Sequence, residues 1–272
     1  MSKIEWTEKT WNVSTGCKKL SPGCKHCYAE TMARRLRAMG AAGYENGFSL
    51  SLMPDRLDRP TRRHKPTLWF VNSMSDLFHE SIPDTYLDQV FAVIDSTPWH
   101  TYQILTKRAE SMRDYFDNRT VPSHVWLGVT VEDRRHGFPR LDILRSIDAR
   151  VRFISAEPLL EDLEGLDLTG MDQALVGGES GPGARPMKPA WVDRIFEVCD
   201  RSQTAFFFKQ WGRWGPDGVA RAKKSNGRLY RGRIWEESPF HRVPVRNPSS
   251  LALQQVHWIS RSSVRSDPKI GK

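Results

Sequence analysis

The chain has 272 residues, with 41 Lys and Arg against 32 Asp and Glu, and its 39% of hydrophobic residues is ordinary for a globular protein. No run approaches the length of about 18 apolar residues that a membrane span needs, and the first eight residues are too polar for a signal peptide. We therefore expect a cytoplasmic protein with no membrane partner. Four cysteines are too few for a disulfide scaffold in a chain of this length.

Seven short runs rich in Val, Ile, Phe and Trp predict buried strands of a parallel sheet. They span residues 11–14, 67–72, 101–106, 125–131, 151–155, 174–178 and 205–209. Apolar residues at helical spacing lie between them, for example Tyr28, Met32, Leu36 and Met39. This alternation predicts an α/β fold, either an incomplete (β/α) barrel of six or seven parallel strands, which we favour, or a doubly wound sheet. In both folds, ligands bind at the carboxyl ends of the strands.

Three of the four cysteines lie in the loop after the first predicted strand: Cys17, Cys24 and Cys27. Three thiolates this close together in sequence are typical of an iron–sulfur cluster or of a zinc site. Zinc normally takes a fourth ligand, which His26 or His64 could supply, although His26 is poorly placed beside Cys27. The cluster is the favoured interpretation, and three unrelated cysteines are a further alternative. Cys199 falls on the apolar stripe of its helix and is predicted to be a core residue.

The cysteine loop, with its Cys24-Lys25-His26-Cys27-Tyr28 segment, resembles the radical S-adenosylmethionine (SAM) superfamily, in which three cysteines after the first strand of a β/α barrel bind a [4Fe–4S] cluster. The gap of six residues between Cys17 and Cys24 is longer than the superfamily's usual spacing. Residues 104–108, 127–133 and 156–158 resemble strand ends of spore photoproduct lyase and its relatives. Over almost its whole length the chain is also similar to the phage Gp37/Gp68-type family, a domain of unknown function. The blocks at residues 70–78, 177–181 and 207–211 carry this second similarity.

These resemblances imply a radical SAM enzyme in which Cys17, Cys24 and Cys27 hold a [4Fe–4S] cluster, and SAM is cleaved to a 5′-deoxyadenosyl radical. A reductant such as flavodoxin or ferredoxin would supply the electron. The lyase-like strand ends and the basic C-terminal residues favour a nucleic acid or a modified nucleobase as the substrate. The alternatives are a zinc-stabilised nucleic-acid-binding protein without catalysis, and a catalytically inactive phage or host-defence interaction module.

Polar residues and glycines after the other predicted strands are the candidate contacts to SAM and substrate. By position we assign cofactor binding to Asn72, Ser73, Ser75, Asp76, Thr130, Glu132, Gly177, Gly178 and Glu179. Lys107 and Glu157 are the candidate catalytic residues, because a lysine can pair with a carboxylate or phosphate and a glutamate can accept from a ribose hydroxyl or act on substrate. The glycines would let the backbone approach the cofactor closely. Each residue has an ordinary alternative as a helix cap, a surface ion pair or part of a tight turn.

The net charge is concentrated near the C-terminus. Residues 211–272 hold 13 Lys and Arg and 4 Asp and Glu, so the rest of the chain is balanced. We predict a barrel domain over residues 1–211 and a basic, partly disordered extension over residues 212–272, which contacts a polyanion or keeps the protein soluble. The aromatic residues of this region are either base-stacking surfaces or a cover for the open side of the barrel, which we favour for Trp211.

Overall fold

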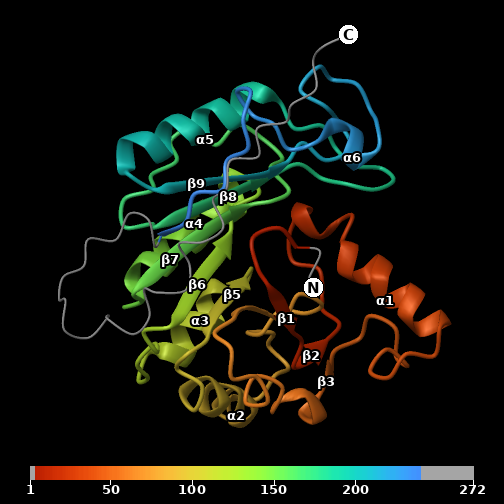
Figure 1. The fold of residues 1–272 in the computed structure, drawn as a ribbon, viewed down its shortest axis with the longest axis vertical. Coiled ribbons are helices and arrows are strands. Elements are labelled where there is room, and N and C mark those ends of the chain that lie inside the picture. Colours follow the sequence, from red (N-terminus) through yellow and green to blue (C-terminus); the bar gives the residue numbers. More distant parts are fainter. Residues whose placement is uncertain (1–3, 240–272) are drawn as a thin grey trace. The chain divides into compact units, whose positions relative to one another are not determined.

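The computed structural model describes residues 4–239. Its main sheet has seven parallel strands in the order β1-β4-β5-β6-β7-β8-β9 (Figure 1). The strands are β1 (Lys9–Trp11), β4 (Leu68–Val71), β5 (Thr101–Thr106), β6 (Val125–Thr130), β7 (Val151–Ala156), β8 (Gln173–Gly177) and β9 (Ala205–Gln210). Because the strand order follows the chain without the reversal of a doubly wound sheet, the incomplete barrel is confirmed and the doubly wound alternative is wrong.

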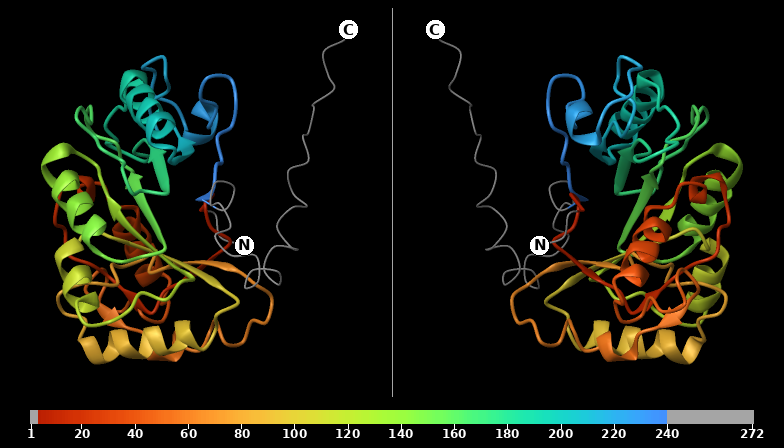
Figure 2. Two further views of the ribbon diagram at one scale, coloured as in Figure 1. Left: turned by 90° about the vertical axis from the view of Figure 1, so that its left-hand side faces the viewer. Right: turned by 90° about the vertical axis from the view of Figure 1, so that its right-hand side faces the viewer.

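Four helices cover the outer side of the curled sheet (Figure 2). They are α2 (Asp84–Asp95), α3 (Ala109–Phe116), α4 (Arg134–Ser146) and α5 (Pro189–Ser202). Their apolar residues form the main core with one face of the strands, and Cys199 of α5 is buried there as predicted. Among residues 4–239, no helix combines the length and the apolar character that a membrane crossing requires.

A second, smaller core fills the inner face of the sheet. It contains Trp6, Phe70, Trp126, Val151, Phe153, Leu175 and Phe207. Phe70 and Leu175 each lie between two residues of the main core, and side chains of a strand alternate between its faces, so this cluster lies on the face opposite the helices. The inner face therefore has an apolar floor.

The segment between β1 and β4 departs from the simple β/α pattern. It holds the antiparallel pair β2 (Ser14–Thr15) and β3 (Ser51–Leu52), the short 3-10 helices η1 (Pro22–Cys24) and η2 (Pro54–Arg56), and α1 (Tyr28–Ala38). The apolar stripe predicted for α1 is wrong, because Tyr28, Met32 and Met39 are 57%, 42% and 78% exposed. The buried face is instead formed by Ala29 and Ala33, since α1 packs on a small cluster beside the sheet and not across it.

The residues after β9 pack on the sheet as part of the same compact unit. The N–H of Phe208 donates to the carbonyl of Trp235 at 3.0 Å, and α6 (Lys223–Asn226) lies in the intervening segment. Trp211 and Tyr230 are buried, and Trp235 stacks edge-to-face on Phe196 with ring centroids 4.6 Å apart. Trp211 packs in the main core beside Phe208, and these aromatic rings contact other side chains of the same chain. Residues 240–272 of the predicted extension lie outside the described residues.

Candidate functional site

The cysteine loop, residues 16–27, joins β2 to α1 at the carboxyl edge of the sheet. Gly16 forms a bridge with Ser75 beyond the end of β4, and the N–H of Cys17 donates to the carbonyl of Phe48 at 3.1 Å. Gly16 has a φ of 80° and lies so close to the backbone of Ser49 that a Cβ would overlap it. The three cysteines of the loop are partly buried free thiols. The structure thus places them at the edge where the fold predicts a ligand site.

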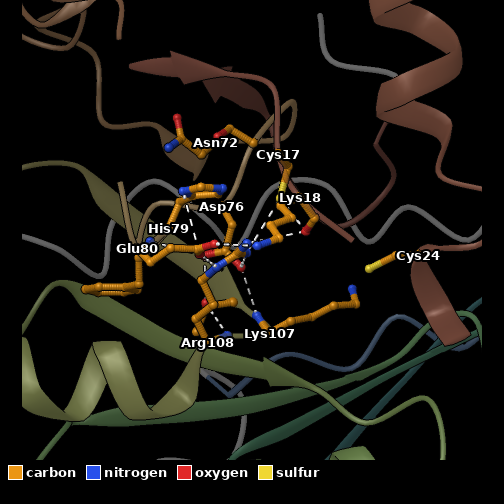
Figure 3. A network of polar contacts seen from close by, with 12 residues as sticks. Cys17, Lys18, Cys24, Asn72, Asp76, His79, Glu80, Lys107 and Arg108 are labelled. Carbon is orange, nitrogen blue, oxygen red and sulfur yellow. Dashed lines mark hydrogen bonds and ion pairs between the residues drawn. The ribbon is translucent and has the colours of Figure 1, made fainter. Parts of the chain in front are cut away.

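Arg108, the second residue after β5, connects the strand end to this loop (Figure 3). Its Nη1 donates to Cys17 Sγ at 3.5 Å and to Asp76 Oδ2 at 3.1 Å, and its Nη2 donates to the carbonyl of Lys18 at 3.3 Å. Its Nε donates to Glu80 Oε2 at 2.7 Å. Sequence reasoning missed this residue: Arg108 is part of a block that resembles lyase strand ends, but only its neighbour Lys107 was given a role.

The Asp76 carboxylate is buried, and groups of the same chain occupy its hydrogen-bonding sites. Besides Arg108, its carboxylate accepts hydrogen bonds from Thr106 Oγ1 at 2.7 Å, from the N–H of Lys107 at 3.0 Å and from the N–H of Phe78 at 3.1 Å. A carboxylate has about four lone-pair sites, so these donors saturate it. The geometry therefore favours a role for Asp76 in holding Arg108 and does not support the predicted contact with SAM.

The other polar residues after β4 also hold the chain near the cysteines: Asn72, Ser73 and Ser75. Asn72 is buried with a φ of 58°; its Oδ1 accepts from the N–H groups of Val13 and Ser14, and its Nδ2 donates to Ser14 Oγ at 2.9 Å. Ser73 Oγ donates to Asn12 Oδ1, and Ser75 Oγ donates to the carbonyl of Gly16 at 2.7 Å. The Asn72 side chain thus makes its hydrogen bonds to the connection between β1 and β2. Ser73 and Ser75 are only partly buried.

Glu132, beyond the end of β6, holds the loop from a second direction. This fully buried carboxylate pairs with Arg140 Nη1 of α4 at 2.7 Å through Oε2, and its Oε1 accepts from Ser21 Oγ of the cysteine loop. Arg140 Nη1 also donates to the carbonyl of Thr130 at 3.1 Å. Glu132 thus links the loop to α4, and its contact with a cofactor stays a prediction.

Glu179, beyond the end of β8, makes the third connection. Glu179 forms a bidentate ion pair with Arg185, whose Nη2 donates to Oε1 at 2.7 Å and whose Nε donates to Oε2 at 3.0 Å. Arg185 Nη2 also donates to the carbonyl of Pro22 in the cysteine loop at 2.9 Å. The ends of β4 and β5, of β6 and of β8 thus each contribute a carboxylate–arginine pair that fastens this loop.

The candidate catalytic residues lie above the apolar floor of the inner face. Strand alternation places Lys107 next after Leu105, and Glu157 beyond Phe153, on that face. Lys107 Nζ donates to Thr130 Oγ1 at 3.2 Å, and Glu157 forms an ion pair with Lys209 of β9 at 2.8 Å. The sequence places Lys209 in the block of residues 207–211 but gives no indication that Lys209 pairs with Glu157.

The two cations after β5 face different thiols. In Figure 3 the Lys107 side chain extends towards Cys24, whereas Arg108 contacts Cys17. Burial opposes ionisation of Cys24, but the Lys107 ammonium and hydrogen bonds from the loop lower the pKa of its thiol overall. Burial and the Asp76 carboxylate raise the pKa of Cys17 against the opposing effect of Arg108. Because a metal-bound cysteine must be a thiolate, both cations favour the ligand form of these side chains.

The side chains of the cysteine loop differ in how they suit a single metal ion and a cluster. Among residues 4–239, no three His, Cys, Asp or Glu side chains converge closely enough to hold a single metal ion, and this holds for the loop cysteines with or without His26 or His64. Three soft sulfur donors around one loop suit a cluster, whose several irons take ligands at its periphery. The ligand set of Cys17, Cys24 and Cys27 fits a cluster in its chemistry and stays a prediction.

The glycines after β8 approach other parts of the chain. A Cβ on Gly178 would overlap the carbonyl oxygen of Trp211, whereas one on Gly177 would lie 3.3 Å from the Glu157 carboxyl group. The close approach expected at Gly178 is therefore made with the backbone after β9. Only Gly177 borders the inner-face residues.

This difference predicts unequal effects on stability. We expect Gly178→Ala to lower the free energy of unfolding by about 1–3 kcal/mol, because the carbonyl of Trp211 belongs to the backbone and must shift. Gly177→Ala meets a side chain that can move, so its cost is expected to stay below about 1 kcal/mol. Urea denaturation of the two variants measures both values. Equal losses would show that the approach to Trp211 does not determine the need for glycine.

The fold and site together define an open, all-parallel β/α half-barrel with a three-cysteine loop at its carboxyl edge. A family model described as "Protein of unknown function (DUF5131)" matches residues 1–239, and the chain belongs to this family. A comparison with curated proteins gives no match.

The solved structures similar to this chain include variants of spore photoproduct lyase. One cysteine-to-serine variant has 17% sequence identity and a TM-score of 0.45, covering 80% of this chain and 68% of its own. A variant with bound AdoMet and dinucleoside spore photoproduct has 12% identity and a TM-score of 0.41, covering 62% of this chain and 55% of its own. The chain thus spans roughly half to two thirds of the length of these structures, and the likeness is too weak to bear on its activity.

Proposed function

We propose that this protein is a radical SAM enzyme whose [4Fe–4S] cluster is held by Cys17, Cys24 and Cys27. The observation that carries the proposal is the attachment of the cysteine loop to the carboxyl ends of the strands by three carboxylate–arginine pairs. Such fastening keeps soft ligands in place without a metal, as a preorganised cofactor site requires. Three protein ligands leave one iron of a [4Fe–4S] cluster free for SAM.

The bound cluster and SAM would supply a 5′-deoxyadenosyl radical, and the chain would position the substrate that reacts with it. Lys107 and the Glu157–Lys209 pair provide charge and hydrogen bonds above an apolar floor, which excludes water from one side. Of the residues assigned to SAM by position, Ser73, Ser75, Thr130 and Gly177 remain candidates for direct contact. Asp76, Glu132 and Glu179 act indirectly, because their ion pairs with arginines hold the loop that carries the cysteine ligands.

The test of this proposal is cleavage of SAM. Anaerobically reconstituted protein, reduced with dithionite, is expected to convert SAM to 5′-deoxyadenosine and methionine, which liquid chromatography with mass spectrometry detects. Cys24→Ala, prepared in the same way, is the control and is expected to form neither product. Absence of 5′-deoxyadenosine from a preparation with full iron content would contradict the proposed activity while leaving cluster binding intact.

A nucleic acid is the proposed substrate class, on the basis of charge. Residues 211–272 hold 13 Lys and Arg against 4 Asp and Glu, and each phosphate that they neutralise adds about 0.7–0.9 to the slope of log K against log[salt]. Truncation after Pro239 removes six of these cations but keeps Trp235, which pairs with β9. Fluorescence anisotropy at several salt concentrations should show weaker DNA binding and a shallower slope for the truncated protein. Failure of the full chain to bind single-stranded or duplex DNA at low salt would exclude this class.

A further inference from the structure

The contact between Arg108 and Cys17 joins a cation to a proposed cluster ligand. The guanidinium is 6% exposed, and its Nη1 lies 3.5 Å from Cys17 Sγ, within hydrogen-bond range for sulfur. The same nitrogen donates to Asp76, and Nε donates to Glu80. Because Arg108 is held by carboxylates on two of its nitrogens, the planar group has a fixed orientation towards the thiol.

Attachment of the loop does not by itself require an arginine that touches sulfur. Arg140 is equally buried and also supports the cysteine loop, but it does so through Glu132 and Ser21 and donates to the carbonyl of Thr130. Arg108 differs in that one of its hydrogen bonds ends on a sulfur atom. The two arginines therefore provide a matched comparison between fastening the loop and acting on a ligand.

We propose that Arg108 is a positioning residue that donates a hydrogen bond to the Cys17 sulfur and thereby raises the reduction potential of the cluster bound there. This inference rests on the proposed function. A hydrogen bond to a ligand sulfur draws electron density away from the iron, and the reduced cluster, which carries one more negative charge, gains more from it than the oxidised cluster. Asp76 opposes the effect, because its carboxylate offsets part of the guanidinium charge beside Cys17.

The two members of the pair should therefore act in opposite directions. Arg108→Lys keeps the positive charge, but a single ammonium group cannot reach Asp76, Glu80 and Cys17 together, so the midpoint potential is expected to fall. Asp76→Asn keeps Arg108 and removes one of its counter-charges, so the midpoint potential is expected to rise. Arg140→Lys perturbs a buried pair that supports the loop without touching sulfur, so any shift that it causes is expected to be smaller than the shift caused by Arg108→Lys.

The experiment is a mediator-buffered redox titration of each reconstituted protein, followed by electron paramagnetic resonance, with iron and sulfide quantified beforehand. Opposite shifts for Arg108→Lys and Asp76→Asn, with a smaller shift for Arg140→Lys than for Arg108→Lys, are the expected result. Unchanged potentials in iron-replete Arg108→Lys and Asp76→Asn would overturn this inference and leave the proposed function standing. If Arg108→Lys does not fold, the direction of the Asp76→Asn shift decides. Absence of a cluster in the unaltered protein would overturn the proposed function, and this inference with it.

Discussion

Alanine at Cys17, Cys24 or Cys27 is expected to remove most of the iron that the anaerobically reconstituted protein binds. Each of these thiols would supply one of three protein ligands, and a cluster held by two cysteines is lost readily. Alanine at Cys199 is expected to leave the iron content unchanged, because Cys199 is buried in the core between α5 and the sheet and lies outside the cysteine loop.

Iron and acid-labile sulfide, measured per chain, check this expectation for all four variants. Circular dichroism shows whether each variant is folded, which matters because the Cys17 thiol is part of the Arg108 network. Iron loss from Cys199→Ala equal to that from the loop variants would contradict the assignment of ligands. Full iron content in any single loop variant would remove that cysteine from the ligand set.

The largest effect on stability is expected for Glu132→Gln. Glu132 is fully buried and pairs with Arg140 at 2.7 Å, so the substitution leaves the guanidinium without its counter-charge. Removing one partner of a buried ion pair costs about 3–5 kcal/mol. Because Glu132 also accepts from Ser21, we expect the cysteine loop to loosen as well.

Guanidinium chloride denaturation measures the loss, and hydrogen exchange of residues 16–27 reports on the loop. Glu161→Gln is the matched control, because Glu161 forms an exposed ion pair at 3.2 Å with Arg134, which lies on α4 as Arg140 does. An exposed ion pair contributes about 0–1 kcal/mol to stability. A similar small loss in both variants, with no change in exchange, would show that the buried pair does not support the loop.

Most strands were predictable because they coincide with short, largely apolar runs. Strands β5, β6 and β7 begin where their runs begin, since burial on both faces leaves the pattern little freedom. The first strand was displaced: the run at residues 11–14 spans the end of β1 and the start of β2, because two short strands share one apolar segment. The strand order required the structure, since periodicity is the same in an open barrel and a doubly wound sheet.

The candidate site was predictable only in part. The spacing of Cys17, Cys24 and Cys27 and their place after the first strand indicated a ligand loop. What Asp76 and Glu132 do depends on partners far away in sequence, and no local pattern indicates that Arg108 and Ser21 contact them. Similarly, the exposure of Met32 on α1 follows from the position of the helix beside the sheet, which helical spacing does not specify.

The most direct test of the central claim is the metal content of the unaltered protein after anaerobic reconstitution. We expect about four iron and about four sulfide per chain, with no zinc, and an electron paramagnetic resonance signal of the reduced cluster that changes when SAM is added. One tightly bound zinc per chain, with neither iron nor sulfide, would contradict the proposed cluster and favour a zinc-stabilised binding protein.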